Sequence, residues 1–532
     1  MNINNLKEKT PITPIFTGQF RLFASYVILS VCSFLHLTAR ADSLLIPMDD
    51  AQADHLRVYG VMYAATKDGV KAQWLLNYRG GSFVLEHTTA MATLCRERGV
   101  TALRLTEKEH AAIENKVKAA DFNGDIIDLT KPPRIAVYTP ATKKPWDDAV
   151  TLALTYAGIP FDKLYVDEVL AGGLANYDWL HLHHEDFTGQ LGKFWAQFAN
   201  AEWYVADKYA TERLAAKHHF SKISQMQLAV VRKIRDFVTA GGNLFAMCSA
   251  TDTYDIALAA DGVDICDMPF DGDPMDPAAN TRLDYSKCFA FTGFNVSINM
   301  YEYEYSSIDN TVMHTTMVEF QDEFTLMPFR AKSDPVPSML CQNHTPAIKG
   351  FMGQTSAFRT QFIKPGVTIM GARTDLREAR YIRGRQGLGS WTFYGGHDPE
   401  DYQHMVNEAP TDLSQHPHSP GYRLILNNVL CMASGKKDAP LPHTTVTPSL
   451  DRSESASLIA IQPGDTEHSL VISATVPWKK IQRIAFVNAK GAEVLVKKYQ
   501  DVSKLTIDMT DLPTGMYSIK VNDMNVGKVM KN

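Results

Sequence analysis

The sequence predicts an α/β protein in which helices flank a parallel β-sheet, followed by a small C-terminal immunoglobulin-like β-sandwich. Between residues 132 and 435, short apolar strand-like runs alternate with helical patterns, as in parallel α/β sheets. After residue 455, only short strand-like runs separated by turn residues follow, which is typical of a sandwich. A chain of 532 residues is long enough for about three or four domains.

The composition is that of an ordinary folded protein. Apolar residues make up 45% of the chain and charged residues 21%, which argues against wholesale disorder and against a multi-span membrane protein. The net charge of -6 comes without long basic runs, so we expect no nucleic-acid partner. The cysteines lack the dense spacing of a disulfide-stapled domain, and only Cys266 and Cys288 are close enough in sequence to suggest a local disulfide.

The N-terminal segment has the parts of a secretory signal peptide. Arg21 provides a positive flank, residues 22–35 form an apolar run, and residues 39–41 form an A-x-A site. Because the run is too short to span a bilayer comfortably, we expect cleavage after Ala41, removal of residues 1–41, and no stable membrane span in the processed protein. A buried helix or an uncleaved anchor is the alternative.

Residues 42–131 are expected to form a small α/β unit. Its elements, in order, are a helix, a strand, a second helix, a strand and a polar helix (49–66, 74–76, from about 87, 100–105 and 107–118). The pair Pro132-Pro133 marks the boundary with the next domain.

Residues 132–435 are expected to form the main α/β domain. Its expected elements are strands 134–138, 161–166, 179–183, 243–247 and 389–394 and helices 148–157, 224–239 and 421–433. The run 243–247 is the clearest buried parallel strand, because it is nearly continuously apolar and follows Gly241-Gly242 at a helix C-cap. We interpret residues 267–389 as an insertion in the sheet or an elaboration of it.

Residues 436–455 are rich in Pro, Thr, Ser and Lys and lack apolar periodicity, which is typical of a linker. The C-terminal β-domain, residues 456–532, then contains the strand-like runs 458–461, 469–474, 483–487, 493–497, 504–508 and 516–521.

Cys248 is the main candidate for chemistry. It directly follows the predicted strand 243–247, with Ala246 and Ala250 two positions to either side. A nucleophile on a sharp strand-to-helix turn needs such small neighbours, and backbone N–H groups of the turn can stabilise an oxyanion and lower a thiol pKa. The alternative is a buried structural cysteine.

His397 is the candidate base. It follows the predicted strand 389–394 and precedes Asp398 and Glu400. A thiol nucleophile needs a base and the base needs an orienting carboxylate, so Cys248, His397 and Glu400 would form a triad if the two strand ends adjoin. Asp398 is the alternative orienter. A turn with a surface histidine is the alternative without catalysis.

Residues 181–186 form a third polar cluster, at the end of the strand 179–183. The residues expected to line the pocket are His183, His184, Glu185, Asp186 and Ser249. A metal-dependent hydrolase that uses His183, His184 and Glu185 is an alternative, which the alternation of side chains along a strand opposes in part. We assign no metal and no cofactor.

Residues 134–433 resemble the class I glutamine amidotransferase-like superfamily in their order of strand, cysteine elbow, helix and late histidine motif. The resemblance implies a flavodoxin-like parallel sheet, with Cys248 as nucleophile, His397 as base and Glu400 as its orienter. Two features depart from the family pattern: alanines replace the usual glycines of the elbow, and Asp398 separates the histidine from Pro399-Glu400.

Segments 45–52, 74–81 and 181–189 resemble a family of exported Bacteroidetes proteins often labelled "asparagine synthetase B". That label implies ATP-dependent amidotransfer. We do not expect this reaction, because such synthetases carry a cysteine directly after the initiator methionine and an S-G-G-x-D-S pyrophosphate loop, and this sequence has neither.

The C-terminal domain resembles the sorting domains of the type IX secretion machinery of Bacteroidetes. Residues 512–517 and the terminal residues 527–531 carry the resemblance. It implies that machinery as a partner and a secreted or cell-surface location reached through the periplasm. A generic immunoglobulin-like module is the alternative.

The function that these observations favour is that of an exported, glutamine amidotransferase-like thiol hydrolase or amidase. It would act through an acyl-enzyme at Cys248 on a small-molecule or peptide-like amide substrate. A non-catalytic binding protein on the same scaffold is the main alternative.

Overall fold

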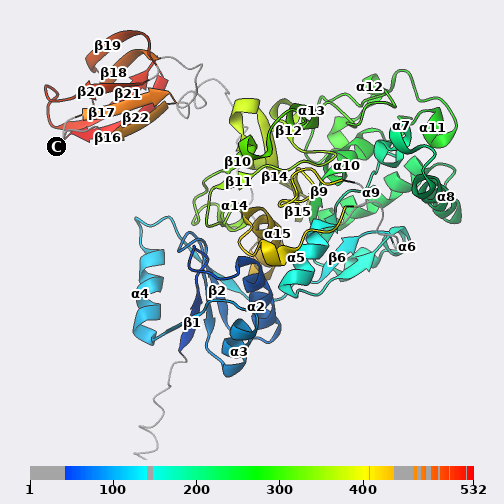
Figure 1. Ribbon diagram of the computed structural model, residues 1–532, viewed down its shortest axis with the longest axis horizontal. Coiled ribbons are helices and arrows are strands. Elements are labelled where there is room, and N and C mark those ends of the chain that lie inside the picture. Colours follow the sequence, from blue (N-terminus) through cyan, green and yellow to red (C-terminus); the bar gives the residue numbers. More distant parts are fainter. Residues whose placement is uncertain are drawn as a thin grey trace, which may run out of the picture. The chain divides into compact units, whose positions relative to one another are not determined.

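The structure is a computed structural model (Figure 1) that describes residues 42–140, 148–405, 408–436, 459–463, 469–474, 481–488, 492–502, 504–522 and 524–531. The chain divides into two compact units, Met1–Pro440 and Leu441–Asn532. The predicted signal peptide and residues 437–455 of the predicted linker lie outside the described residues.

Unit 1 begins with an antiparallel sheet in the order β4-β1-β3-β2-β5. Its strands are β1 (Ser43–Ile46), β2 (Ala72–Leu75), β3 (Phe83–Glu86), β4 (Leu103–Leu105) and β5 (Ile126–Leu129), and its helices are α2 (His55–Lys67), α3 (Thr89–Glu97) and α4 (Glu107–Lys118). Helix α2 begins later than predicted because Asp54 caps it, its carboxylate accepting the Arg57 N–H at 2.9 Å.

The second sheet of unit 1 is mixed, with the strand order β11-β10-β13-β14-β15-β9-β8-β6-β7. Its parallel part consists of β6 (Ile135–Tyr138), β7 (Asp162–Leu164), β8 (Trp179–Leu182), β9 (Asn243–Met247) and β15 (Gly389–Tyr394). Its antiparallel part consists of β10 (Glu323–Leu326), β11 (Ala347–Lys349), β12 (Phe358–Arg359), β13 (Thr368–Arg373) and β14 (Glu378–Gln386).

Residues 267–389 therefore supply strands to the main sheet, and the sheet is not purely parallel. The change of direction occurs at a hairpin, in which Gln386 of β14 pairs with Gly389 of β15 and Gly387 has a φ of 59°. A short turn joins only antiparallel strands, since parallel strands need a long crossover.

Two hydrophobic cores cover the opposite faces of the main sheet. Phe245 and Met247 of β9 lie in one core, and Leu244 and Ala246 lie in the other. The first core also contains α2, α5 (Ala149–Ala157), α15 (Pro420–Cys431) and the N-terminal sheet; the second contains α6 (Val166–Leu170), α9 (Ile223–Thr239) and α10 (Ser249–Ala259). The remaining helices are α7 (Trp195–Phe198), α8 (Glu202–Lys217), α11 (Met268–Asp271), α12 (Ala279–Arg282), α13 (Thr311–His314) and α14 (Pro335–Leu340).

Unit 2 contains two antiparallel sheets, β16-β17-β20 and β19-β18-β21-β22. Their strands are β16 (Ile459–Pro463), β17 (Ser469–Ala474), β18 (Ile481–Val487), β19 (Glu493–Val502), β20 (Lys504–Asp508), β21 (Gly515–Val521) and β22 (Met524–Lys531). Ile472 and Ile507 of one sheet share a hydrophobic cluster with Phe486 and Ile519 of the other, which fits a β-sandwich.

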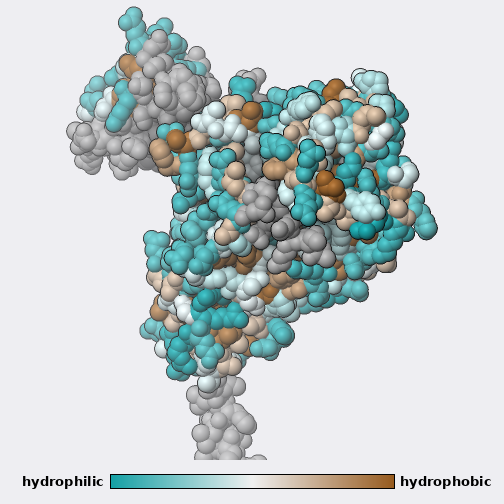
Figure 2. Space-filling model, turned by 45° about the vertical axis from the view of Figure 1, so that its right-hand side comes forward, coloured by the Kyte–Doolittle hydropathy of each residue, from teal (hydrophilic) through white to brown (hydrophobic). Residues whose placement is uncertain are grey.

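The surface and the thiols are ordinary for a folded protein. No helix of the described ranges is long and apolar enough to cross a membrane. The face in Figure 2 is mostly hydrophilic, with scattered apolar residues.

Cys266 and Cys288 are free and do not form a local disulfide; their thiols donate to the carbonyls of Thr188 and Asp255, respectively, at 3.3 Å.

Candidate functional site

Cys248 lies on a strained turn between β9 and α10. Its φ of 51° and ψ of −139° are rare for a residue with a side chain. The chain must turn sharply here because β9, paired on both sides by β8 and β15, leads directly into α10. Ala246 and Ala250 are fully buried around the turn. The predicted elbow is therefore present.

Backbone N–H groups surround the Cys248 sulfur. The Gln354 N–H donates to Sγ at 3.2 Å, and a Cβ added at Gly353 would lie 3.0 Å from Sγ, so only glycine allows this close approach. Burial raises the pKa of the Cys248 thiol to about 11, although backbone N–H groups of Thr355, Gln354 and Ser249 lower it. The sequence analysis did not identify residues 353–355 as part of the site. Gly353 is the one residue among them whose type could have indicated a close approach of the backbone.

The backbone of His397 lies close to this sulfur. It follows β15 after Gly396, whose φ is 94°, and the Cys248 N–H donates to the Gly396 carbonyl at 3.1 Å. The Cβ position at Gly353 is 2.9 Å from the His397 backbone nitrogen as well as 3.0 Å from Cys248 Sγ. The ends of β9 and β15 thus bring the backbones of the two predicted residues close to each other.

His183, at the end of β8, takes the position next to Nδ1 of His397. Its Nε2 lies 3.0 Å from that nitrogen, with the two rings perpendicular at 89°. Its Nδ1 lies 3.7 Å from Oδ1 of Asp148, the same oxygen that lies 3.3 Å from Nε2 of His181. We call Asp148, His183 and His397 the histidine chain.

The electrostatics of the histidine chain favour a charged Asp148 and a neutral His183. Burial raises the pKa of Asp148, but His181, His183 and hydrogen bonds together hold it well below its usual range. Burial and the neighbouring His397 hold the pKa of His183 well below its usual value. Asp148 also caps α5, accepting the N–H groups of Val150 and Thr151 at 2.7 and 2.9 Å. The sequence analysis did not identify Asp148 as a site residue. Its position at the start of a predicted helix is the one feature that could have indicated its role.

Glu400 and Asp398, the two predicted orienters, contact the loop that follows them. Asp398 accepts the Glu400 N–H at 2.9 Å and the Thr411 hydroxyl at 2.8 Å. The Glu400 carboxylate lies 3.2 Å from His416 Nδ1. Because His183 lies at Nδ1 of His397, we assign the role of orienter to His183 instead of Glu400 or Asp398.

The other predicted residues divide into two groups. His184 lines the cavity described next, and burial lowers its pKa to about 4. Glu185 accepts the His183 N–H at 2.8 Å, and burial raises its pKa to about 8. Asp186 accepts the N–H groups of Thr188 and Gly192. Ser249 is fully buried at the start of α10. These last three shape the loops around the site.

A cavity of about 550 Å³ opens on the thiol and is called the thiol cavity. Its lining includes His184, Lys193, Phe194, Phe198, Trp203, Cys248, Tyr303, Met352, Gln354, His397 and His404. Phe198 and Trp203 have ring centroids 5.2 Å apart and form an aromatic wall with Phe194. Burial lowers the pKa of Lys193 to about 8, and its Nζ donates to the carbonyls of Ser297 and Glu304. The cavity can hold a mainly apolar group beside a polar one.

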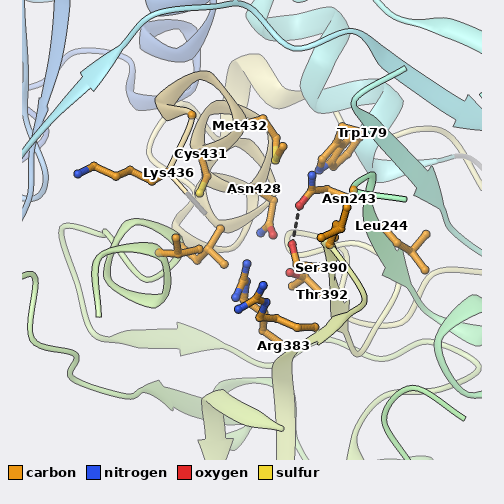
Figure 3. Close-up of a pocket in the computed structure, with 17 residues that line it drawn as sticks. Trp179, Asn243, Leu244, Arg383, Ser390, Thr392, Asn428, Cys431, Met432 and Lys436 are labelled. Carbon is orange, nitrogen blue, oxygen red and sulfur yellow. Dashed lines mark hydrogen bonds between the residues drawn. The ribbon is translucent and has the colours of Figure 1, made fainter. Parts of the chain in front are cut away.

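A smaller cavity of about 120 Å³ lies at the opposite, amino-terminal ends of the parallel strands (Figure 3). Asn243 accepts a hydrogen bond from Ser390 there, and Arg383 and Lys436 also line it. Ligands of α/β sheets bind outside the carboxyl ends of the strands, so the thiol cavity is the better candidate site.

Comparison with known proteins identifies the C-terminal part of the chain. Residues 462–532 match the family described as "Secretion system C-terminal sorting domain". This is the sorting domain that the type IX secretion machinery handles, and the protein is exported to the cell surface or secreted. No curated protein matches the chain.

Three solved structures show remote likeness. A DUF3244 family protein from Bacteroides vulgatus with an immunoglobulin-like β-sandwich is 17% identical, with 15% of this chain and 89% of that one covered and a TM-score of 0.13. A cytoplasmic protein from Salmonella typhimurium is 9% identical (56% and 97% covered, TM-score 0.26). The GH42 β-galactosidase Gan42B of G. stearothermophilus is 10% identical in a catalytic mutant form; 75% of this chain spans only 41% of that protein, and the TM-score is 0.24.

Proposed function

We propose that unit 1 is an exported, glutamine amidotransferase-like cysteine hydrolase that cleaves amides through an acyl-enzyme at Cys248. The observation that supports the proposal is the strained turn at Cys248, which lines the same cavity as His397 and accepts the Gln354 N–H at its sulfur. Strain of this kind is concentrated at functional sites. Export supports an extracytoplasmic substrate.

The histidine chain supplies the base. Because Nδ1 of His183 faces Asp148, we assign the His183 proton to that nitrogen. Nε2 of His183 then accepts a hydrogen bond from Nδ1–H of His397. This leaves Nε2 of His397 with a lone pair that can take the thiol proton, as in a Cys-His pair oriented by a third group.

The reaction has two halves. His397 takes the Cys248 proton as sulfur attacks the amide carbon, and the oxyanion is stabilised by backbone N–H groups such as that of Gln354. Collapse breaks the C–N bond, the amine leaves with the proton from His397, and a thioester forms. Water, deprotonated by His397, then cleaves the thioester to a carboxylate and restores the thiol.

Alkylation by iodoacetamide, mapped by mass spectrometry on the secreted protein, tests the nucleophile. We expect Cys248 to react first among the cysteines, and His397→Ala to slow this reaction by about tenfold or more. Cys341→Ser, which removes another thiol, is the control and should leave the rate at Cys248 unchanged. A Cys248 that reacts no faster than Cys341 would contradict the proposal.

Turnover of a panel of peptidyl 7-amino-4-methylcoumarin amides tests the reaction. Cys248→Ser should abolish any turnover found, and His397→Ala should lower kcat by about 100-fold or more. Turnover that survives Cys248→Ser would reject the acyl-enzyme.

A non-catalytic binding protein is the second candidate. The high pKa of the resting Cys248 thiol favours it, because a neutral thiol is a poor nucleophile unless a base acts on it. Tight binding of an amide by the Cys248→Ser variant, without turnover by the wild type, would support this candidate.

A further inference from the structure

His183, His184 and His397 converge at the thiol cavity from two different strand ends. Each offers one ring nitrogen, and these three nitrogens lie within 4.8 Å of one another. His183 and His184 follow β8, and His397 follows β15. His184 and His397 line the cavity, so an ion at this point would have access to solvent and to small molecules.

We infer that these three histidines bind a divalent transition-metal ion, with zinc as the best fit, and leave one coordination position open to the thiol cavity. Three imidazoles and an open position are a common zinc arrangement. Two nitrogens bound tetrahedrally to one zinc lie about 3.3 Å apart. His183 Nε2 and His397 Nδ1 are already 3.0 Å apart, so these two rings need to move little, and the His184 nitrogen must approach them from within 4.8 Å.

The surroundings of these histidines support a metal site. Metal-bound histidines usually direct their second nitrogen at a carboxylate or carbonyl; Nδ1 of His183 faces Asp148 at 3.7 Å, longer than a hydrogen bond, and would need a small approach of the two groups. Nδ1 of His184 is buried without a hydrogen-bond partner among the described residues, although buried nitrogens normally have one.

The ligand set differs from the one that the sequence suggested. Glu185 accepts a hydrogen bond from the backbone N–H of His183 at 2.8 Å and is not one of the three ligands. His397, which is distant in sequence, is the third ligand instead. Only the tertiary structure brings these three imidazoles together.

Zinc should inhibit the thiol reaction; this part of the inference rests on the proposed function. If zinc occupies Nδ1 of His397, the single proton of that neutral ring moves to Nε2. Nε2 then has no lone pair for the Cys248 proton. Metal binding and base catalysis are thus mutually exclusive at this ring.

Calorimetric titration of the chelator-treated, full-length secreted protein with zinc chloride tests the site. We expect one ion per chain at this site, with affinity at least about tenfold lower in His184→Ala and His397→Ala. His87→Ala, which removes a histidine elsewhere in unit 1, should bind like the wild type. Zinc binding that both cavity variants leave unchanged, or no binding, would overturn the inference.

Two further measurements keep the test decisive. If His397→Ala fails to fold by circular dichroism, His184→Ala carries the comparison. Cobalt(II) in place of zinc should give the intense visible absorption of a four-coordinate ion; the weak spectrum of a six-coordinate ion would contradict the site.

Iodoacetamide labelling separates the two parts of the inference. Zinc should slow alkylation of Cys248 in the wild type but not in His184→Ala. Binding without slower alkylation would leave the metal site in place and reject the inhibition. The calorimetric result does not depend on whether the protein is a hydrolase. Zinc binding can therefore be observed even if the protein hydrolyses no amide.

Discussion

At the scale of single residues, the reactivity of Cys248 depends on how its proton leaves. Burial keeps the resting thiol neutral near pH 7, since its pKa is about 11. The backbone N–H groups that point at Sγ favour the thiolate but do not overcome burial. Proton transfer to His397 during attack is therefore required, and the groups behind His397 become important.

Asp148→Asn tests the histidine chain without removing the α5 cap. Asparagine still accepts the N–H groups of Val150 and Thr151, but it lacks the charge that holds the His183 proton on Nδ1. We expect the alkylation rate of Cys248 to fall by about tenfold or more and its pH profile to shift.

Asp148→Ala provides the matched comparison for Asp148→Asn. It loses the cap as well, which should cost a further about 1 kcal/mol of unfolding free energy. Equal alkylation rates of Cys248 in the wild type and in Asp148→Asn across the pH range would show that Asp148 does not take part in the histidine chain.

At the scale of elements, α10 fixes a neighbouring loop through one carboxylate. Asp255 accepts three backbone N–H groups, from Phe289 at 2.6 Å, Ala290 at 2.7 Å and Phe291 at 2.9 Å. All three donors belong to buried residues of the second core. This contact anchors the segment before β10 against the helix that begins at the elbow.

Asp255→Ala should therefore destabilise unit 1 strongly. Each buried N–H left without a partner costs about 1–3 kcal/mol, so we expect a loss of about 3 kcal/mol or more in unfolding free energy, measured by urea unfolding. Asp284→Ala, an exposed loop aspartate, should change it by less than about 1 kcal/mol. Similar values for both variants would show that the three contacts contribute little.

At the scale of the whole molecule, a histidine cluster joins the N-terminal sheet region to the main domain within unit 1. His55 at the start of α2 stacks on His344 with centroids 4.5 Å apart, and its Nδ1 lies 3.0 Å from Nδ1 of His418. Burial, together with Arg423, lowers the pKa of His55 to about 3 and that of His344 to about 4. Arg423 lies 3.2 Å from His344 Nδ1.

Acid should weaken unit 1 through this cluster. A histidine with a lowered folded pKa stabilises the protein above its unfolded pKa of 6.5; this contribution is lost as the pH falls from there towards 3 to 4, because the unfolded chain binds protons first. Buried carboxyls with raised pKa values, such as Glu185, act in the opposite direction, so the comparison with a variant isolates the cluster. We expect the urea midpoint of His344→Gln to respond less unfavourably than that of the wild type to a change from pH 7 to pH 5. A slope identical to that of a His87→Gln control would contradict this role.

The sorting domain should act independently of the fold of unit 1. Truncation after Lys436 removes all of the match at residues 462–532, and we expect the remaining chain to keep its circular dichroism spectrum but accumulate in the periplasm. Immunoblots of periplasm, cell surface and medium provide the measurement. Unchanged surface or medium levels would mean that export uses another signal, and aggregation would mean that unit 1 needs unit 2.

Local patterns along the chain predict the strands Asn243–Met247 and Gly389–Tyr394, the residues Cys248 and His397 that follow them, and the sorting motif. Apolar periodicity, small residues and turn residues act over a few neighbours, so a linear pattern records them. Which groups meet depends on the three-dimensional fold. His183, 214 residues from His397, comes to its Nδ1 because β8, β9 and β15 are adjacent in the sheet. The N–H of Gln354 reaches Cys248 because no side chain at Gly353 blocks the approach. Strand order depends on the sum of pairing and packing energies over many residues that are distant in sequence. A pattern of neighbouring residues does not contain this information.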